Sequence, residues 1–183
     1  AIDRWVISNA FATLARYRNS RGPAMAETTV CAINVSGASL GDDEFLGFVQ
    51  DQFAMHGIPP RQVCFEITET TAVASLTKAT EFMAALRAAG CRFALDDFGV
   101  GVSSFTYLKH LPVDYLKIDG SFVKDMLEDP VNHAMVEAIH RTGSYLTSAT
   151  RSFIGMIALS VILMPSGQTS VQHLVMLHIP SPK

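Results

Sequence analysis

The segment CRFALDDFG (91–99) decides the fold, because an apolar run ends there in two consecutive aspartates and a glycine. Three further apolar runs also end in polar residues: TTVCAINVS (28–36), VCFEITET (63–70) and DYLKIDG (114–120). Helical patterns separate these runs, and alternating strands and helices predict an α/β fold with a parallel sheet. Parallel strands bring their carboxyl ends to one edge, where a (β/α) barrel carries its active site.

The side chains at these strand ends belong to types that bind metals and phosphates. The candidates are Asn34, Glu66, Glu69, Asp96, Asp97, Lys117 and Asp119. Carboxylate and amide oxygens favour Mg²⁺ or Mn²⁺ over zinc. Two such ions, about 3.5–4 Å apart, would stabilise the attacking and leaving oxygens of a phosphoryl displacement. The pattern is therefore typical of a catalytic site.

The two consecutive aspartates place a condition on the local backbone. Neighbouring side chains of a regular strand face opposite ways, so Asp96 and Asp97 can serve one site only where the strand curls into its loop. There each aspartate can hold a different ion, or one can bridge both. The alternative is that the pair only caps the next helix. The polar residues at the equivalent strand ends favour the metal site.

The other charged residues of the edge leave more than one interpretation open. Glu66 and Glu69 face opposite ways in a regular strand, so we expect one ligand and one supporting residue, although Glu69 can also be simply solvated. A lysine such as Lys117 inside an apolar strand must be paired or functional, unless it extends to the edge without a role. Gly99 and Gly101 give a flexible turn, which is a weak phosphate-loop signal.

Length and composition set the class of protein. The chain has 183 residues, fewer than the roughly 250 of a complete eight-stranded barrel. Its 49% apolar and 17% charged residues indicate a soluble globular protein, and a net charge of −3 argues against DNA or RNA binding. Cys31, Cys64 and Cys91 lie in strand runs and predict reduced, buried thiols in a cytoplasmic protein. No histidine falls in a zinc-binding motif.

Helices are predicted around and between the strands. The first helix, ending near Tyr17, is amphipathic rather than a secretory signal, and it begins without a cap, as if the chain were cut inside a domain. Further helices are expected between Asp42 and Gly57, over 75–89, over 103–111, and from Asp129 to Thr142 with Gly143 as the cap.

Residues 144–183 differ in character from the rest of the chain. No Asp, Glu, Lys or Arg lies between Ser152 and Pro182. The apolar run 152–164 has 13 residues, too few for the roughly 17–25 that span a bilayer, so no membrane contact is expected. We predict either a buried strand or helix there, or a tail that is not native to the domain.

Four spaced motifs together resemble the EAL-domain phosphodiesterases, which hydrolyse cyclic di-GMP. They are INVSG (33–37), FEITET (65–70), FALDDFGVGVSSF (93–105) and LPVDYLKIDGSFV (111–123). The resemblance covers about residues 1–143 and implies a modified TIM barrel. The number and order of these four motifs make the resemblance highly specific.

The resemblance also implies roles for individual residues. Two divalent ions, Mg²⁺ or Mn²⁺, are expected to be held by Asn34, Glu66, Asp96 and Asp97. Lys117 is expected to contact the catalytic water, and Glu69 to order the loop that follows DDFG. Asp119, at the end of the fourth strand, completes the expected catalytic residues.

The sequence departs from the family at several positions. The Glu-Ala-Leu segment, which supplies a metal-binding glutamate, is expected before Ala1, and a later catalytic glutamate is expected near Phe153. A later substrate-binding glutamine segment is also missing, and Val100 and Val102 replace the usual Thr and Tyr. We therefore expect about strands 2 to 5 of an incomplete TIM-type barrel, with 144–183 as an atypical apolar, frameshifted or foreign tail.

The function implied by the resemblance is metal-dependent hydrolysis of cyclic di-GMP to linear pGpG in bacterial signalling. The parent protein is expected to carry GGDEF, PAS or other sensory domains, and homodimers are possible. Without two of the family's glutamates, this chain is expected to have little or no activity. The alternatives are a degenerate module that binds cyclic di-GMP or a protein partner without cleaving it, and a non-functional fragment.

An incomplete barrel also has consequences for folding. A closed barrel has no edges, whereas four or five strands leave two open edges and a half-covered apolar interior. Only 152–164 and 171–179 remain as apolar cover, and neither carries charged gatekeeper residues. We predict a half-barrel of marginal stability that oligomerises or aggregates when isolated.

Overall fold

Strands and helices alternate along the first two thirds of the chain. The computed structural model describes residues 2–21, 30–100, 105–124, 128–146, 156–163 and 169–178. Its first elements are α1 (Ile2–Arg21), β1 (Cys31–Asn34), α3 (Gly37–Leu40), α4 (Phe45–His56), the 3-10 turn η1 (Pro60–Gln62) and β2 (Val63–Thr68). The next are α5 (Glu69–Ala74), α6 (Leu76–Ala88), β3 (Arg92–Phe98), the 3-10 turn η2 (Phe105–Lys109) and β4 (Tyr115–Ile118). The last are α7 (Gly120–Lys124), α8 (Pro130–Leu146), β5 (Met156–Leu163) and β6 (Thr169–His178).

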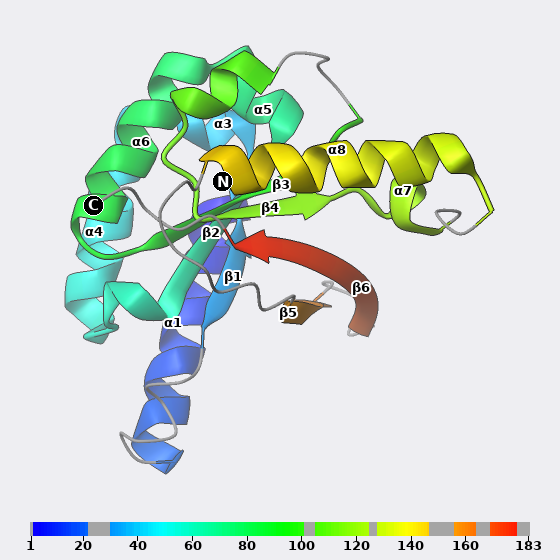
Figure 1. Ribbon diagram of the computed structural model, residues 1–183. Helices are drawn as coiled ribbons and strands as arrows, with labels where there is room; N and C mark the ends of the chain where they lie inside the picture. The colour runs from blue at the N-terminus through cyan, green and yellow to red at the C-terminus, as the bar shows by residue number, and fades with distance from the viewer. Residues whose placement is uncertain are drawn as a thin grey trace.

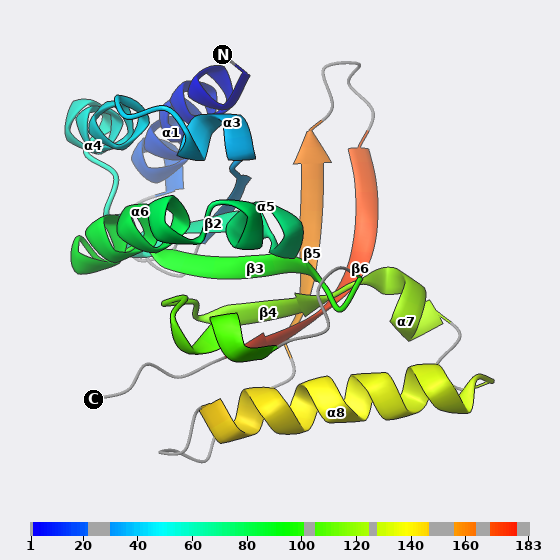
Figure 2. The same ribbon diagram turned by 90° about the horizontal axis from the view of Figure 1, so that it is seen from above.

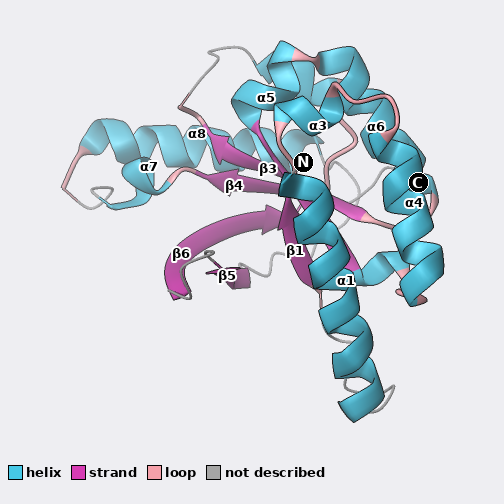
Figure 3. Ribbon diagram, turned by 180° about the vertical axis from the view of Figure 1, so that it is seen from behind, coloured by secondary structure: helices cyan, strands magenta, loops and turns pink. Residues whose placement is uncertain are grey.

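Strands β1 to β4 form the parallel sheet that the sequence predicts. They lie in chain order, and the full order of the sheet is β1-β2-β3-β4-β6-β5. Asn34 pairs with Glu66, and Thr68 with Asp96, so the polar ends of neighbouring strands lie at the same edge. Figure 3 shows these strands with α4 and α6 on one side, and Figure 1 shows the same layers from the front.

The C-terminal segments form an antiparallel hairpin beside the parallel sheet. β5 pairs with β6 along its whole length, and β6 pairs antiparallel with β4, placing Met176 opposite Lys117 (Figure 2). Of the predicted alternatives for the apolar run, the structure therefore has a strand. Phe153 lies outside the described residues. Within the described ranges, no helix has both the length and the apolar character needed to cross a membrane.

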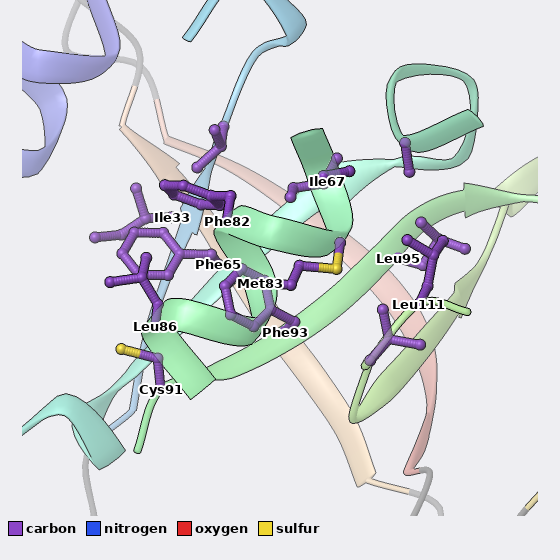
Figure 4. Packing of buried hydrophobic residues seen from close by; sticks show 14 of the residues in the cluster. Ile33, Phe65, Ile67, Phe82, Met83, Leu86, Cys91, Phe93, Leu95 and Leu111 are labelled. Carbon is purple, nitrogen blue, oxygen red and sulfur yellow. The ribbon is translucent and has the colours of Figure 1, made fainter. Parts of the chain in front are cut away.

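The apolar core lies between the parallel strands and the helices that cover them. Phe65 and Phe93 are fully buried and their ring centroids are 5.7 Å apart. Phe82 of α6 meets Phe93 edge-on at 6.1 Å, and Figure 4 shows the three rings close together with Met83 and Leu86. Burying each such side chain stabilises the fold by roughly 1.5–3 kcal/mol. This packing fixes one face of the strands and leaves the other face for polar residues.

Several predicted boundaries were wrong. α1 continues past Tyr17 to Arg21, because only the following Gly22 and Pro23 break the helical sequence. α8 continues through Gly143 to Leu146, since a helix tolerates an internal glycine at a cost of about 1 kcal/mol. The first strand, predicted over 28–36, is Cys31–Asn34 in the described part, and residues 28 and 29 lie outside the described residues.

The predicted strand 63–70 and the predicted helix 103–111 also differ from the structure. β2 ends at Thr68, whose hydroxyl accepts from the Thr71 N–H and so caps α5. Glu69 is therefore a helical residue and not a strand end. Of the predicted helix, the described part is the 3-10 turn η2, which ends shortly before Pro112.

Candidate functional site

The backbone of β3 curls at the two aspartates. Pairing with β4 shifts register between Leu95 and Phe98, which is a bulge-like irregularity. Asp97 has φ 53°, in the left-handed region, and its N–H donates to Asp96 Oδ1 at 3.0 Å. Bulges re-aim side chains, and strained backbone conformations cluster at functional sites. The condition for both aspartates to serve one site is thus present.

Lys117 links three neighbouring strands through its ammonium group. Its Nζ lies 2.7 Å from Glu66 Oε2 and 2.6 Å from Asp96 Oδ2. The exposed side-chain fractions are 4% for Lys117, 4% for Glu66 and 17% for Asp96. Lys117 is therefore paired inside the sheet, and the alternative of a lysine that merely extends to the edge is wrong.

Burial and pairing compete in the electrostatics of this cluster. Burial acts to lower the pKa of Lys117, but its hydrogen bonds to Asp96 and Glu66 outweigh burial and raise that pKa. Burial raises the pKa of Glu66, and the Lys117 ammonium only partly opposes this. Burial also raises the pKa of Asp97, reinforced by the negative charges of Asp96 and Asp119. One ammonium faces several carboxylates, which favours an additional cation.

Glu66 has one carboxylate oxygen left over. Oε1 is buried and has no hydrogen-bond partner among the described residues. Asn34, the neighbour of Glu66 in the sheet register, is exposed and adds an amide oxygen of the type that hard divalent cations bind. Within the described ranges, no three Asp, Glu, His or Cys side chains already converge on one metal position. The donor chemistry therefore fits Mg²⁺ or Mn²⁺, while the Lys117 ammonium lies between two of the donors.

Glu69 is buried and both of its carboxylate oxygens are used. It is 1% exposed, so the interpretation of a solvated side chain is wrong. Oε2 accepts from the Gly99 N–H at 2.9 Å, and Oε1 accepts from the Tyr107 hydroxyl. Tyr107 was missed at the sequence level. The only available signal was that a tyrosine inside an apolar segment needs a hydrogen-bond partner when buried.

Asp119 and Gly99 hold the two turns that flank the polar cluster. Asp119 Oδ1 accepts from the Ser121 N–H at 2.8 Å, and the Asp119 N–H donates to the Phe98 carbonyl at 3.3 Å. Gly99 has φ 103°, and a Cβ there would lie 3.2 Å from Phe122 and 3.4 Å from Ile139. The turn after β3 thus needs glycine and packs against α7 and α8. Gly101 and Val102 lie outside the described residues.

Sequence comparison assigns the chain to a family. The family described as "EAL domain" matches residues 1–148. The chain belongs to the EAL-domain family. Cyclic di-GMP phosphodiesterase PdeB of Shewanella oneidensis is 42% identical over 138 residues, which are 75% of this chain and 16% of PdeB. This EAL chain spans about a fifth or less of the length of the first curated relatives that it matches.

Solved structures of EAL domains share the fold. The EAL domain of Mycobacterium smegmatis DcpA is 35% identical with a TM-score of 0.71, over 79% of this chain and 63% of that one. The PaMucR phosphodiesterase in complex with c-di-GMP is 28% identical with a TM-score of 0.71, over 79% of this chain and 57% of that one. The predicted fold is confirmed: the EAL chain is part of a TIM-type barrel.

Proposed function

We propose that this EAL chain forms part of a metal-dependent phosphodiesterase site for cyclic di-GMP. The observation that carries the proposal is the bridge from Lys117 to Glu66 and Asp96 at the carboxyl edge of the parallel sheet. The unpaired second oxygen of Glu66 supports a cation at this edge. Cyclic di-GMP as the substrate is supported by family membership and by the names of the relatives.

The metal ligands in this proposal are oxygen donors from three strands. They are Asn34, Glu66, Asp96 and Asp97. Divalent ions bound there would lower the pKa of a bound water and neutralise developing negative charge on the phosphate. The left-handed φ of Asp97 supports the assignment of both consecutive aspartates to one site. Mg²⁺ and Mn²⁺ both suit a site made only of oxygens.

The other three candidate residues, Lys117, Glu69 and Asp119, would bind water or phosphate, or hold the backbone of the site in position. Lys117 is charged at neutral pH, so its ammonium can hold a water molecule or neutralise a phosphate oxygen. Glu69 holds the turn after β3 through the Gly99 N–H. Asp119 fixes the start of α7 and adds negative charge beside Asp97.

We further propose that the 183-residue polypeptide has little or no hydrolytic activity. Glu137 is its last acidic residue, so residues 138–183 supply no carboxylate to a site. The test is incubation of the chain with cyclic di-GMP and Mg²⁺ or Mn²⁺, with pGpG measured by chromatography. We expect no turnover above that of a Lys117→Met control. Turnover comparable with that of a complete EAL phosphodiesterase would contradict the proposal.

The second candidate function is binding without cleavage. It is favoured by the Lys117 ammonium, which already pairs with two carboxylates that would hold metal. Calorimetry with cyclic di-GMP and Ca²⁺ measures affinity, and the assay with Mg²⁺ or Mn²⁺ measures product. The two results together separate the two functions. Affinity without product favours a binding module, whereas neither affinity nor product favours a non-functional fragment.

The setting of the domain is also a proposal. Curated relatives are about five times longer or more than the part that this chain matches, which supports a larger signalling protein with GGDEF, PAS or other sensory domains. We place the domain in the cytoplasm, where cyclic di-GMP would be met, and propose that it can form a homodimer. Size-exclusion chromatography with light scattering on the chain tests the dimer, and a monomer at all concentrations would exclude it.

A further inference from the structure

Tyr107 lies outside the set of polar strand ends, yet it touches one of them. It belongs to η2, is 8% exposed, and its hydroxyl donates to Glu69 Oε1. The other oxygen of the same carboxylate accepts from the Gly99 N–H at 2.9 Å. Glu69 therefore connects η2 to the turn that follows Asp96 and Asp97.

We propose that Tyr107 is a positioning residue that fixes the turn at Asp97–Gly99 by holding the Glu69 carboxylate. A buried carboxylate with one oxygen unpaired carries a desolvation cost, and rotation or hydration of the group would relieve it. The phenol removes this freedom because it occupies Oε1 while Gly99 occupies Oε2. The link of this turn to metal binding rests on the proposed function.

The turn is held from its other side by packing. A Cβ at Gly99 would lie 3.2 Å from Phe122 and 3.4 Å from Ile139, so α7 and α8 leave no space for the turn to shift toward them. Asp97, with its left-handed φ of 53°, thus precedes a turn that is held by the Glu69 hydrogen bond to Gly99 and by the packing at Gly99. A strained conformation persists only where the surroundings over-determine it. Loss of the Tyr107 hydrogen bond removes one of these constraints without changing the packing.

The first test reads the turn directly, without metal or nucleotide. In the full chain labelled with ¹⁵N-glycine, Tyr107→Phe is expected to speed amide exchange at Gly99 about tenfold, equivalent to about 1.4 kcal/mol. Gly90, whose N–H donates to Arg87 at the end of α6, is the internal reference and is expected to be unchanged. Tyr17→Phe on α1 is the matched control. Unchanged exchange at Gly99, or equally faster exchange at Gly90, would overturn the inference.

A conservative variant at Glu69 tests whether its two hydrogen bonds, rather than the packing around Gly99, hold the turn. Glu69→Gln can still accept from the Gly99 N–H with its oxygen and donate to the Tyr107 oxygen with its amide group. Exchange at Gly99 in this variant is expected within about threefold of the wild type. Exchange as fast as in Tyr107→Phe would show that the connection itself does not hold the turn.

The second test addresses metal binding. Free Mn²⁺ measured by electron paramagnetic resonance is expected to show about tenfold weaker binding in Tyr107→Phe, as for other supporting residues of metal sites. Equal Mn²⁺ affinity in the two proteins would contradict the link between the turn and the metal. If the wild-type chain binds no Mn²⁺, the proposed function fails, and exchange at Gly99 alone decides the role of Tyr107.

Discussion

The two faces of β2, β3 and β4 differ in what they contribute. On the helix-covered face, Phe65 and Phe93 are fully buried and both meet Phe82 edge-on. On the opposite face, Glu66 is equally inaccessible at 3% exposed, but it is charged and paired with Lys117. Burial of aromatic rings stabilises a fold, whereas a buried ion pair contributes little net stability. Neighbouring positions of one strand thus contribute separately to the apolar core and to the buried ion pair.

The largest effect is expected on the apolar face. Phe93→Ala removes a fully buried ring that contacts Phe65 and Phe82, and we expect a loss of about 4 kcal/mol in the free energy of unfolding. Urea unfolding of the chain measures this loss. Trp5→Ala is the control, because Trp5 is 64% exposed and its loss should change stability by less than about 0.5 kcal/mol. Equal losses in both variants would mean that the apolar face does not hold the fold.

Breaking the ion pair on the opposite face comes next. Lys117→Met leaves Glu66 and Asp96 without their buried cation, and we expect a loss of about 3 kcal/mol near neutral pH. Burial raises the pKa of Glu66 above 4.5, and a raised carboxyl pKa favours the folded state at low pH and disfavours it as pH rises through that pKa. The loss should therefore shrink toward acid pH. Urea titrations at about pH 7 and about pH 5 measure it, and a pH-independent loss would contradict this account.

Metal binding should stabilise the polar face. At Mn²⁺ concentrations about a hundredfold above its Kd, the free energy of unfolding is expected to rise by about 2.7 kcal/mol. In the proposed site the ion would need deprotonated Glu66 and Asp97, whose pKa values burial raises, so the gain should fall away as pH decreases toward those raised values. Thermal melts with and without Mn²⁺ across this pH range provide the measurement. Stabilisation that persists below the ordinary carboxyl pKa would place the ion elsewhere.

The smallest effect on stability is expected at Asn34. Its side chain is exposed, so Asn34→Ala should change the free energy of unfolding by less than about 0.5 kcal/mol. Mn²⁺ affinity should nevertheless fall by about tenfold, or about 1.4 kcal/mol, if the amide oxygen is a ligand. Comparing urea unfolding with Mn²⁺ titration of the same variant separates the two roles. Unchanged affinity would remove Asn34 from the ligand set.

The sequence predicted most of what depends on strand order. Apolar runs alternating with helical patterns were enough to predict parallel strands, and parallel strands bring Asn34, Glu66 and Asp96 to one edge whatever the details of packing. The aspartate pair set a condition, because both side chains could serve one site only if the strand curled there, and Asp97 has a left-handed φ at that point. These features follow from local pattern and topology alone.

The sequence could not predict features that depend on three-dimensional pairing. Glu69 was assigned to a strand because the Thr68 hydroxyl, which caps α5, leaves only a weak sequence signal. The hydrogen bond from Tyr107 to Glu69 joins residues 38 positions apart, and no periodicity reports such a pair. The hairpin of β5 and β6 could not be distinguished from a helix, since a short apolar run fits both.

The antiparallel contact of β6 with β4 has a consequence for the order of folding. Asn34 and Glu66 pair across 32 residues, whereas Lys117 and Met176 pair across 59. Loop-closure entropy rises by about 0.6 kcal/mol for each doubling of loop length, so the longer closure is the less favourable first step. We expect β1 to β4 to gather first and the preformed hairpin to dock as a later kinetic phase. Pulse-labelled hydrogen exchange during refolding would reveal this order as late protection of the amides that bond β6 to β4, after those within the hairpin and between β1 and β4.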